Sequence, residues 1–230
     1  MIKGKYSKFS QYYVAVDCII FGFNKESLKL LLVKRKFEPM KGHWSLMGGF
    51  LKENESLDDA AARILHNLTG LSNLYLEQLY TYGEVNRDPE DRVLSVAYYA
   101  LIPTDQYDKK LGKKYGAYWF DFCKKPDLIF DHDVMVDKAL RRLQRKCRTQ
   151  PIGFELLPEK FTIPQLQRLY EAIHHTSYDK RNFRKKILSM SILEKLDEKE
   201  KTGSRKGAFL YRFDEDKYKN AVEKGFLFEL

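Results

Sequence analysis

Apolar and polar positions follow two different periodicities in the first part of the chain. Apolar, β-branched runs are typical of buried strands, and they predict strands at 12–23, 28–36, 74–84, 93–102 and 117–122. Apolar residues at helical spacing predict helices over 60–68 and 134–148. Strands mixed with two helices indicate an α/β or α+β domain, which we place at residues 1–150.

The pattern changes near Pro151. Thr162 with Gln165 three residues later forms a capping box, which predicts the start of an amphipathic helix. A short spacer leads to Asp179, a suitable N-cap for a second helix with the sequence KRNFRKKILSM. The segments ILEKL and AFLYRF flank a polar loop and predict a hairpin. Helix, short turn, basic helix and hairpin predict a winged helix-turn-helix over residues 151–230.

Composition narrows the class of protein. The 230 residues are 43% hydrophobic and 14% aromatic, which suffices for a buried core. No apolar run reaches the roughly 18 residues that cross a bilayer, and the first residues contain no apolar signal core. The three cysteines are widely spaced and odd in number, which favours neither a disulfide framework nor a zinc site. We therefore expect a cytoplasmic protein with no membrane partner.

The positive charge is concentrated in two runs. The net charge is +9, and such an excess favours nucleic acid or another anionic partner. Residues 138–148 hold six basic and no acidic residues, and residues 180–206 hold ten basic and four acidic ones. Either run is also compatible with a solvated helix face, so the charge alone does not identify a binding site.

The stretch GFLKENESLDDAAARILHNLTGL, from Gly49 to Leu71, carries the most specific motif. Its spacing resembles the box of the Nudix family, with matches at Gly49, Glu55, Arg63, Leu65, Gly70 and Leu71. Three positions that the family fills with acids hold Ile64, Asn67 and Leu68 instead. The resemblance implies a Nudix-like α/β/α sandwich with its metal ligands replaced.

The replaced acids decide the expected chemistry. Their spacing puts them on one face of a helix, where the family's carboxylates hold magnesium or manganese. Isoleucine and leucine supply no ligand, so we predict no metal, no cofactor and no catalytic residues. Two alternatives stay open. One is a hydrolase of ADP-ribose or a related nucleotide that uses Glu55 with Asp58 or Asp59 as metal ligands. The other is an RNA- or DNA-associated protein with an empty Nudix fold. The simpler roles are a helix start for both aspartates and an ion pair between Glu55 and Arg63.

A cleft without a metal can still bind a ligand. Ligand sites combine apolar walls with a few placed polar groups. Aromatic faces with carboxylate and amide groups suit a sugar, and we predict ligand contacts from Trp44, Tyr82, Glu84, Asn86 and Arg87.

The basic helix and hairpin predict contacts with double-stranded DNA. Donors that reach base edges and cations that hold phosphates are both needed. The residues expected to supply them are Lys180, Arg181, Asn182, Arg184, Lys185, Lys186, Arg205 and Lys206.

The two parts together resemble the Nudix-related transcriptional regulators, which join a Nudix-like domain to a C-terminal winged helix. The resemblance implies a homodimer that binds a palindromic operator and responds to a small molecule. Members differ in the effector. We expect a repressor of carbohydrate use that senses a sugar such as L-arabinose, as in a branch from Bacteroides. The alternative is a regulator of NAD metabolism that senses ADP-ribose.

Overall fold

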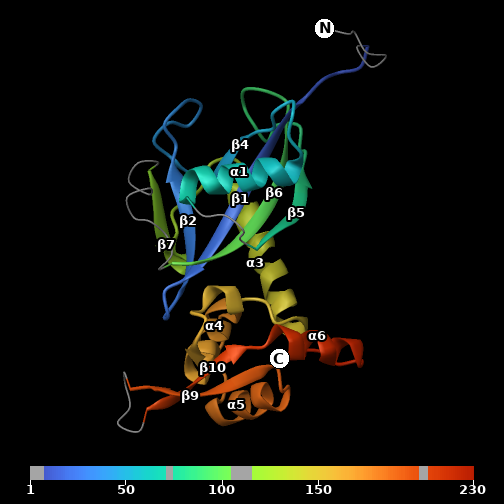
Figure 1. The fold of residues 1–230 in the computed structure, drawn as a ribbon. Coiled ribbons are helices and arrows are strands. Elements are labelled where there is room, and N and C mark those ends of the chain that lie inside the picture. Colours follow the sequence, from blue (N-terminus) through green and yellow to red (C-terminus); the bar gives the residue numbers. More distant parts are fainter. Residues whose placement is uncertain (1–7, 71–74, 105–115, 202–206) are drawn as a thin grey trace.

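Seven strands form one mixed sheet in the N-terminal part of the molecule (Figure 1). The computed structural model describes residues 8–70, 75–104, 116–201 and 207–230. The strand order is β3-β2-β1-β6-β5, with β4 paired to β1 and β7 to β2, and the central pair β1 and β6 is parallel. The strands are β1 (Tyr13–Phe23), β2 (Leu28–Lys34), β3 (Trp44–Ser45), β4 (Met47–Phe50), β5 (Leu76–Tyr82), β6 (Val93–Pro103) and β7 (Ala117–Asp121).

One helix covers each face of this sheet. Side chains of β1 alternate, so that Val16, Cys18 and Ile20 pack with α1 (Leu57–Thr69). Ile19 and Phe21 point to the opposite face and pack with α3 (His132–Thr149). Alternation follows from the two-residue repeat of a strand. The α/β/α sandwich that the sequence predicts is confirmed.

The helix of the Nudix box is fixed at both ends by its own sequence. The Ser56 hydroxyl accepts from the Asp59 N–H, and the Asp59 carboxylate accepts from the Ser56 N–H, both at 3.2 Å. These two bonds close a capping box at the start of α1. Gly70 ends the helix with φ at 73°, a left-handed conformation that suits glycine.

The C-terminal part is a winged helix. Thr162 caps α4 in the predicted capping box with Gln165, and Asp179 caps α5. A three-stranded sheet of order β8-β10-β9 completes the fold, and its strand β8 was not predicted. Helix α6 was not predicted either. The elements are β8 (Phe161–Thr162), α4 (Ile163–His174), α5 (Lys180–Ser189), β9 (Leu193–Glu200), β10 (Ala208–Phe213) and α6 (Glu215–Glu223).

A single apolar cluster runs through both parts of the chain. Leu143 and Cys147 near the end of α3 belong to the same cluster as Leu166 and Leu169 of α4. The Gln144 side-chain amide also donates to the Ile173 carbonyl at 2.8 Å. The winged helix therefore packs directly against α3, and it lies beneath the sheet in Figure 1. The boundary at residue 150 stays a prediction.

Within the part of the chain that the structure describes, no helix has the length and apolar character needed to span a membrane.

Candidate ligand pocket and DNA-binding surface

The helix of the Nudix box does not present a metal-binding face. Ile64 is only 3% exposed and packs in the apolar cluster between α1 and the sheet. Asn67 is exposed but offers only a neutral amide. Among the described residues, no group of three histidine, cysteine or acidic side chains is placed to hold a metal ion. Hard divalent cations need several oxygen ligands, so these residues do not fit the metal that the resemblance implies.

The acids that remain near this helix are held in structural contacts. Arg63 donates to both oxygens of Glu55, from Nε at 2.7 Å and from Nη2 at 2.5 Å. Hydrogen bonding from Arg63 lowers the pKa of Glu55 to about 2. Asp58 accepts from the Tyr98 hydroxyl at 2.5 Å, and Asp59 closes the capping box. The predicted ion pair between Glu55 and Arg63 is confirmed.

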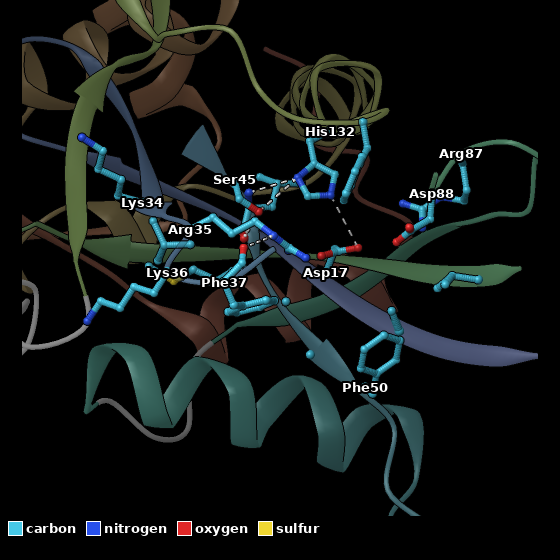
Figure 2. A pocket seen from close by; sticks show the side chains of 18 residues that line it. Asp17, Lys34, Arg35, Lys36, Phe37, Ser45, Phe50, Arg87, Asp88 and His132 are labelled. Atoms are coloured by element: carbon cyan, nitrogen blue, oxygen red, sulfur yellow. Dashed lines mark hydrogen bonds and ion pairs between the residues drawn. The ribbon is translucent and has the colours of Figure 1, made fainter. Parts of the chain in front are cut away.

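A pocket of about 330 Å³ lies where β1, β4 and the start of α3 meet (Figure 2). Several separate segments form its wall. Those segments contribute Ala15 and Asp17 of β1, residues 33–37, residues 45–50, Arg87, Asp88, Val93, Phe130 and His132. The volume lies at the lower end of the range for small-molecule sites.

Aromatic rings and cations line the mouth of this pocket. Phe37 is 64% exposed and Phe50 is 57% exposed, which is unusual for phenylalanine. The guanidinium of Arg35 lies over the Phe37 ring at 4.1 Å, and its Nε donates to the Pro39 carbonyl at 2.6 Å. Lys34 and Lys36 flank it in sequence and also line the pocket, but their amino groups extend away from the cavity (Figure 2), and Lys34 Nζ lies 5.9 Å from the centre of the Trp44 ring. The wall thus offers flat apolar faces beside positive charge.

A carboxylate lies at the floor of the pocket. Asp17 is 7% exposed, and its Oδ2 accepts from the Ser95 hydroxyl at 2.5 Å. His132 Nε2 lies 3.9 Å from the same oxygen (Figure 2). The pocket therefore combines the guanidinium of Arg35 with a buried carboxylate (Figure 2).

Three of the predicted ligand residues lie together at one side of the pocket. Arg87 lines the main pocket, and with Glu84 and Asn86 it also lines an adjoining hollow. The Arg87 guanidinium donates to both oxygens of Asp131, at 3.0 and 2.7 Å. Its side chain is 3% exposed, so it holds the loop against the start of α3.

The structure does not place the two predicted aromatic contacts at the pocket. Trp44 packs edge-on against Phe120, with ring centroids 4.8 Å apart, and does not line the cavity. Tyr82 is 8% exposed, and its ring packs against Tyr80. Both side chains belong to the packing of the sheet because their strands point them away from the cavity. Their predicted contact with a ligand has no support in this geometry.

Sequence reasoning missed several residues that line the pocket. Asp17, Arg35, Phe37, Phe130 and His132 come from segments far apart in the chain, so no local motif joins them. One signal was present. Asp17 is the only charged residue in the predicted apolar strand YYVAVDCIIFGF, and a charge in such a run is a candidate functional group.

Helix α5 carries an exposed basic face. Phe183 and Ile187 are buried and fix its orientation. Its polar outer residues are all exposed, and no ion pair is found for its cations among the described residues. These residues are Lys180, Arg181, Asn182, Arg184, Lys185 and Lys186. The predicted contacts Arg205 and Lys206 lie outside the described residues.

The turn between α4 and α5 is fastened by side-chain hydrogen bonds. The Gln167 amide donates to Glu171 and to the Tyr178 carbonyl, each at 2.9 Å. Glu171 also accepts from the Tyr178 N–H at 2.9 Å. Asp179 then accepts from the Asn182 N–H at 2.8 Å and starts α5. The second helix is thus held at a fixed angle to the first, as a helix-turn-helix requires.

Comparison with known proteins agrees with this division. The NUDIX domain family matches residues 11–128, and the NrtR DNA-binding winged helix domain matches residues 153–213. The ADPR responsive transcriptional repressor NtrR of Acinetobacter baylyi is 34% identical over 204 residues, covering 87% of this chain and 81% of that protein. The ADP-ribose pyrophosphatase of Methanocaldococcus jannaschii is 33% identical over 138 residues, covering 60% of this chain and 78% of that enzyme.

Solved structures of NrtR from Shewanella oneidensis are also similar. The complex with a 27mer DNA has a TM-score of 0.81 at 29% identity, covering 90% of this chain and 95% of that one. The NUDIX domain of the same protein in complex with ADP ribose has a TM-score of 0.52 at 29% identity, covering 62% and 99%. The chain therefore belongs to the NrtR family, in which a NUDIX domain is joined to a DNA-binding winged helix domain.

Proposed function

We propose that this protein is a transcriptional repressor that binds ADP-ribose in its NUDIX domain without hydrolysing it. The pocket beside β1 is the observation that carries the proposal. ADP-ribose contains a flat base, a diphosphate and two riboses. Exposed phenylalanine rings suit the base, and the guanidinium of Arg35 suits the diphosphate.

The names of the relatives support this choice of effector over a sugar. Our expectation from the sequence was L-arabinose. The Acinetobacter repressor is named as ADPR responsive, and the Shewanella domain was solved with ADP ribose. The cationic wall of the pocket also favours an anionic ligand over a neutral pentose. We therefore replace the sugar by ADP-ribose.

The basic face of α5 is the surface that contacts DNA in this proposal. Its unpaired cations and Asn182 suit phosphates and base edges in the major groove. We propose that a homodimer places two copies of this helix on a palindromic operator, with half-sites spaced by helical turns. ADP-ribose alters DNA affinity only if it binds one arrangement of the two copies better than the other.

Binding measurements test this function directly. The operator is first selected from random duplexes, and its affinity is then measured by fluorescence anisotropy with and without ADP-ribose. We expect ADP-ribose to raise the midpoint of thermal unfolding and to shift operator affinity, because a ligand stabilises the state it binds. L-Arabinose at the same concentration should change neither. Absence of both effects with ADP-ribose would overturn the proposal.

A second candidate is an ADP-ribose hydrolase, and the Methanocaldococcus enzyme is the reason to test it. The apolar burial of Ile64 and the ion pair of Glu55 with Arg63 argue against it. AMP release from ADP-ribose is measured with magnesium and with manganese, beside Glu55→Gln. We expect the unmodified chain to release AMP no faster than Glu55→Gln does. Turnover that disappears in Glu55→Gln would establish the enzyme instead.

A further inference from the structure

Asp17 is a buried carboxylate with few partners. It stands in the middle of β1, where its neighbours in sequence are apolar or small. Within the described part of the chain, its contacts are the hydrogen bond from Ser95 at 2.5 Å and the approach of His132 Nε2 at 3.9 Å. A carboxylate has lone pairs for about four hydrogen bonds. Asp17 therefore retains capacity to accept further donors.

Gly48 gives this carboxylate its access to the pocket. Asp17 and Gly48 are register partners on the antiparallel strands β1 and β4. A Cβ atom at Gly48 would lie only 2.1 Å from Asp17 Oδ1, so any other residue would displace the carboxylate. Both residues line the cavity. The glycine thus allows the acid to lie across β4 at the cavity floor.

His132 does not neutralise Asp17. The Leu46 N–H lies 3.2 Å from His132 Nδ1 and donates to it, so the ring proton is on Nε2, which faces Asp17. Burial lowers the pKa of His132, against the opposing effects of Asp17 and Asp131. The imidazole is therefore neutral near pH 7 and acts as a weak, distant donor. The negative charge of Asp17 is left available to a ligand.

The geometry points to Asp17 as the residue that accepts a hydrogen bond from a ribose hydroxyl of the bound ligand. This inference rests on the proposed function, because it takes ADP-ribose as the ligand. A carboxylate accepts a hydrogen bond from a hydroxyl and repels a phosphate. The diphosphate is then directed to the guanidinium of Arg35, and a ribose hydroxyl to the carboxylate of Asp17. Asp17 sets both the orientation of the ligand and the requirement for a free hydroxyl.

The test combines a variant with ligands that lack hydroxyls. Affinities of the full chain and of Asp17→Asn are measured by calorimetry for three compounds. These are ADP-ribose, ADP, which lacks the terminal ribose, and 2′,3′-dideoxy-ADP-ribose, which lacks the hydroxyls of the adenosine ribose. We expect Asp17→Asn to weaken ADP-ribose binding about tenfold, because a hydrogen bond to a charged acceptor is stronger than one to a neutral amide. The effect should vanish for the analogue that lacks the hydroxyl in question.

A matched variant controls for the loss of charge. Asp121 also accepts from a serine hydroxyl, Ser27 Oγ at 2.6 Å, but it does not line the pocket. Asp121→Asn should leave all three affinities unchanged. If Asp17→Asn does not fold, Ser95→Ala removes the donor that orients Asp17. The Ser95→Ala variant should show the same dependence on the ligand hydroxyl, with a smaller loss.

The outcomes separate this inference from the proposed function. No binding of ADP-ribose to the unmodified chain overturns both. Binding to the unmodified chain with no loss in Asp17→Asn overturns the inference alone. An equal loss for all three ligands also overturns it, because Asp17 would then only support the shape of the pocket.

Discussion

Two helices of this chain carry similar numbers of basic residues, six on α3 and five on α5, in different surroundings. On α3, Arg142 and Lys146 both pair with Glu77 of β5, and Lys138 Nζ lies 3.1 Å from the centre of the Tyr80 ring. On α5, the cations are exposed without ion pairs among the described residues. A carboxylate and a ring of the protein thus hold several charges of α3, whereas the exposed cations of α5 are predicted to meet an external partner.

The difference follows from what each helix packs against. Helix α3 lies on the sheet, where Glu77 also accepts a hydrogen bond from the Tyr99 hydroxyl at 2.9 Å. This cluster holds the last turns of α3 and thus supports the winged helix that follows. Helix α5 lies at the surface, and its apolar side consists of the buried Phe183 and Ile187 with the partly buried Leu188. Its remaining positions are free for an external partner.

The largest expected effect comes from reversing charge on α5. The double variant Arg181→Glu with Arg184→Glu should weaken operator binding by at least 100-fold, because two favourable phosphate or base contacts become repulsive. The same charge change on α3, Arg141→Glu with Arg145→Glu, is the control, since both residues are exposed there. We expect it to weaken binding far less. Equal losses in anisotropy titrations would mean that net charge, rather than α5, drives binding.

A smaller effect should distinguish base reading from phosphate binding within α5. Arg181 lies in the first turn, and Arg181→Ala should cost about 1–3 kcal/mol for the operator but much less for unrelated DNA. Lys185→Ala should weaken binding to all sequences and reduce the salt dependence by about one charge. Titrations at several salt concentrations distinguish base contacts from phosphate contacts. A uniform loss in Arg181→Ala would remove its role in base reading.

The smallest effect concerns α3 and depends on pH. Burial raises the pKa of Glu77, but hydrogen bonds from Lys146, Tyr75 and Tyr99 outweigh it and lower the pKa below its ordinary value of 4.5. A carboxyl with a lowered folded-state pKa stabilises the fold above its ordinary pKa, and this contribution is lost as pH falls through the lowered value. Glu77→Gln should therefore be less stable near pH 7, by about 1 kcal/mol after allowing for solvent screening.

Denaturant unfolding at several pH values measures this contribution. The difference between the unmodified chain and Glu77→Gln should shrink as pH falls below 4.5. Operator affinity near pH 7 should be nearly unchanged, because Glu77 lies on the sheet and away from α5. A constant difference at all pH values would contradict the role given to the ion pairs.

Local chemistry made much of the fold predictable. The capping boxes at Ser56 and Thr162 and the cap at Asp179 mark helix starts within a few residues, so they can be recognised without tertiary contacts. Apolar runs located the long strands for the same reason. Helix α6 was missed because it is short and none of its residues is fully buried, so that Tyr218, which packs partly against the apolar cluster, gives only a weak periodic signal.

The pocket was far less predictable because it depends on contacts between distant segments. Arg87 pairs with Asp131, and Asp17 meets Ser95 and His132, across more than forty residues in each case. Trp44 and Tyr82 were predicted as ligand contacts from residue type alone, and the structure packs both rings against other rings. Their residue types suit a ligand, but only the register of the strands decides which way an aromatic ring points.

The apolar cluster that joins α3 to α4 predicts that the two parts of the chain unfold as one cooperative unit. Because Leu143 and Leu166 are buried against the same neighbours, separating the parts would expose apolar surface on both. Heating should thus melt them together in one calorimetric transition. A compound that stabilises the sheet would then protect the helices below it from proteolysis, although it touches none of them.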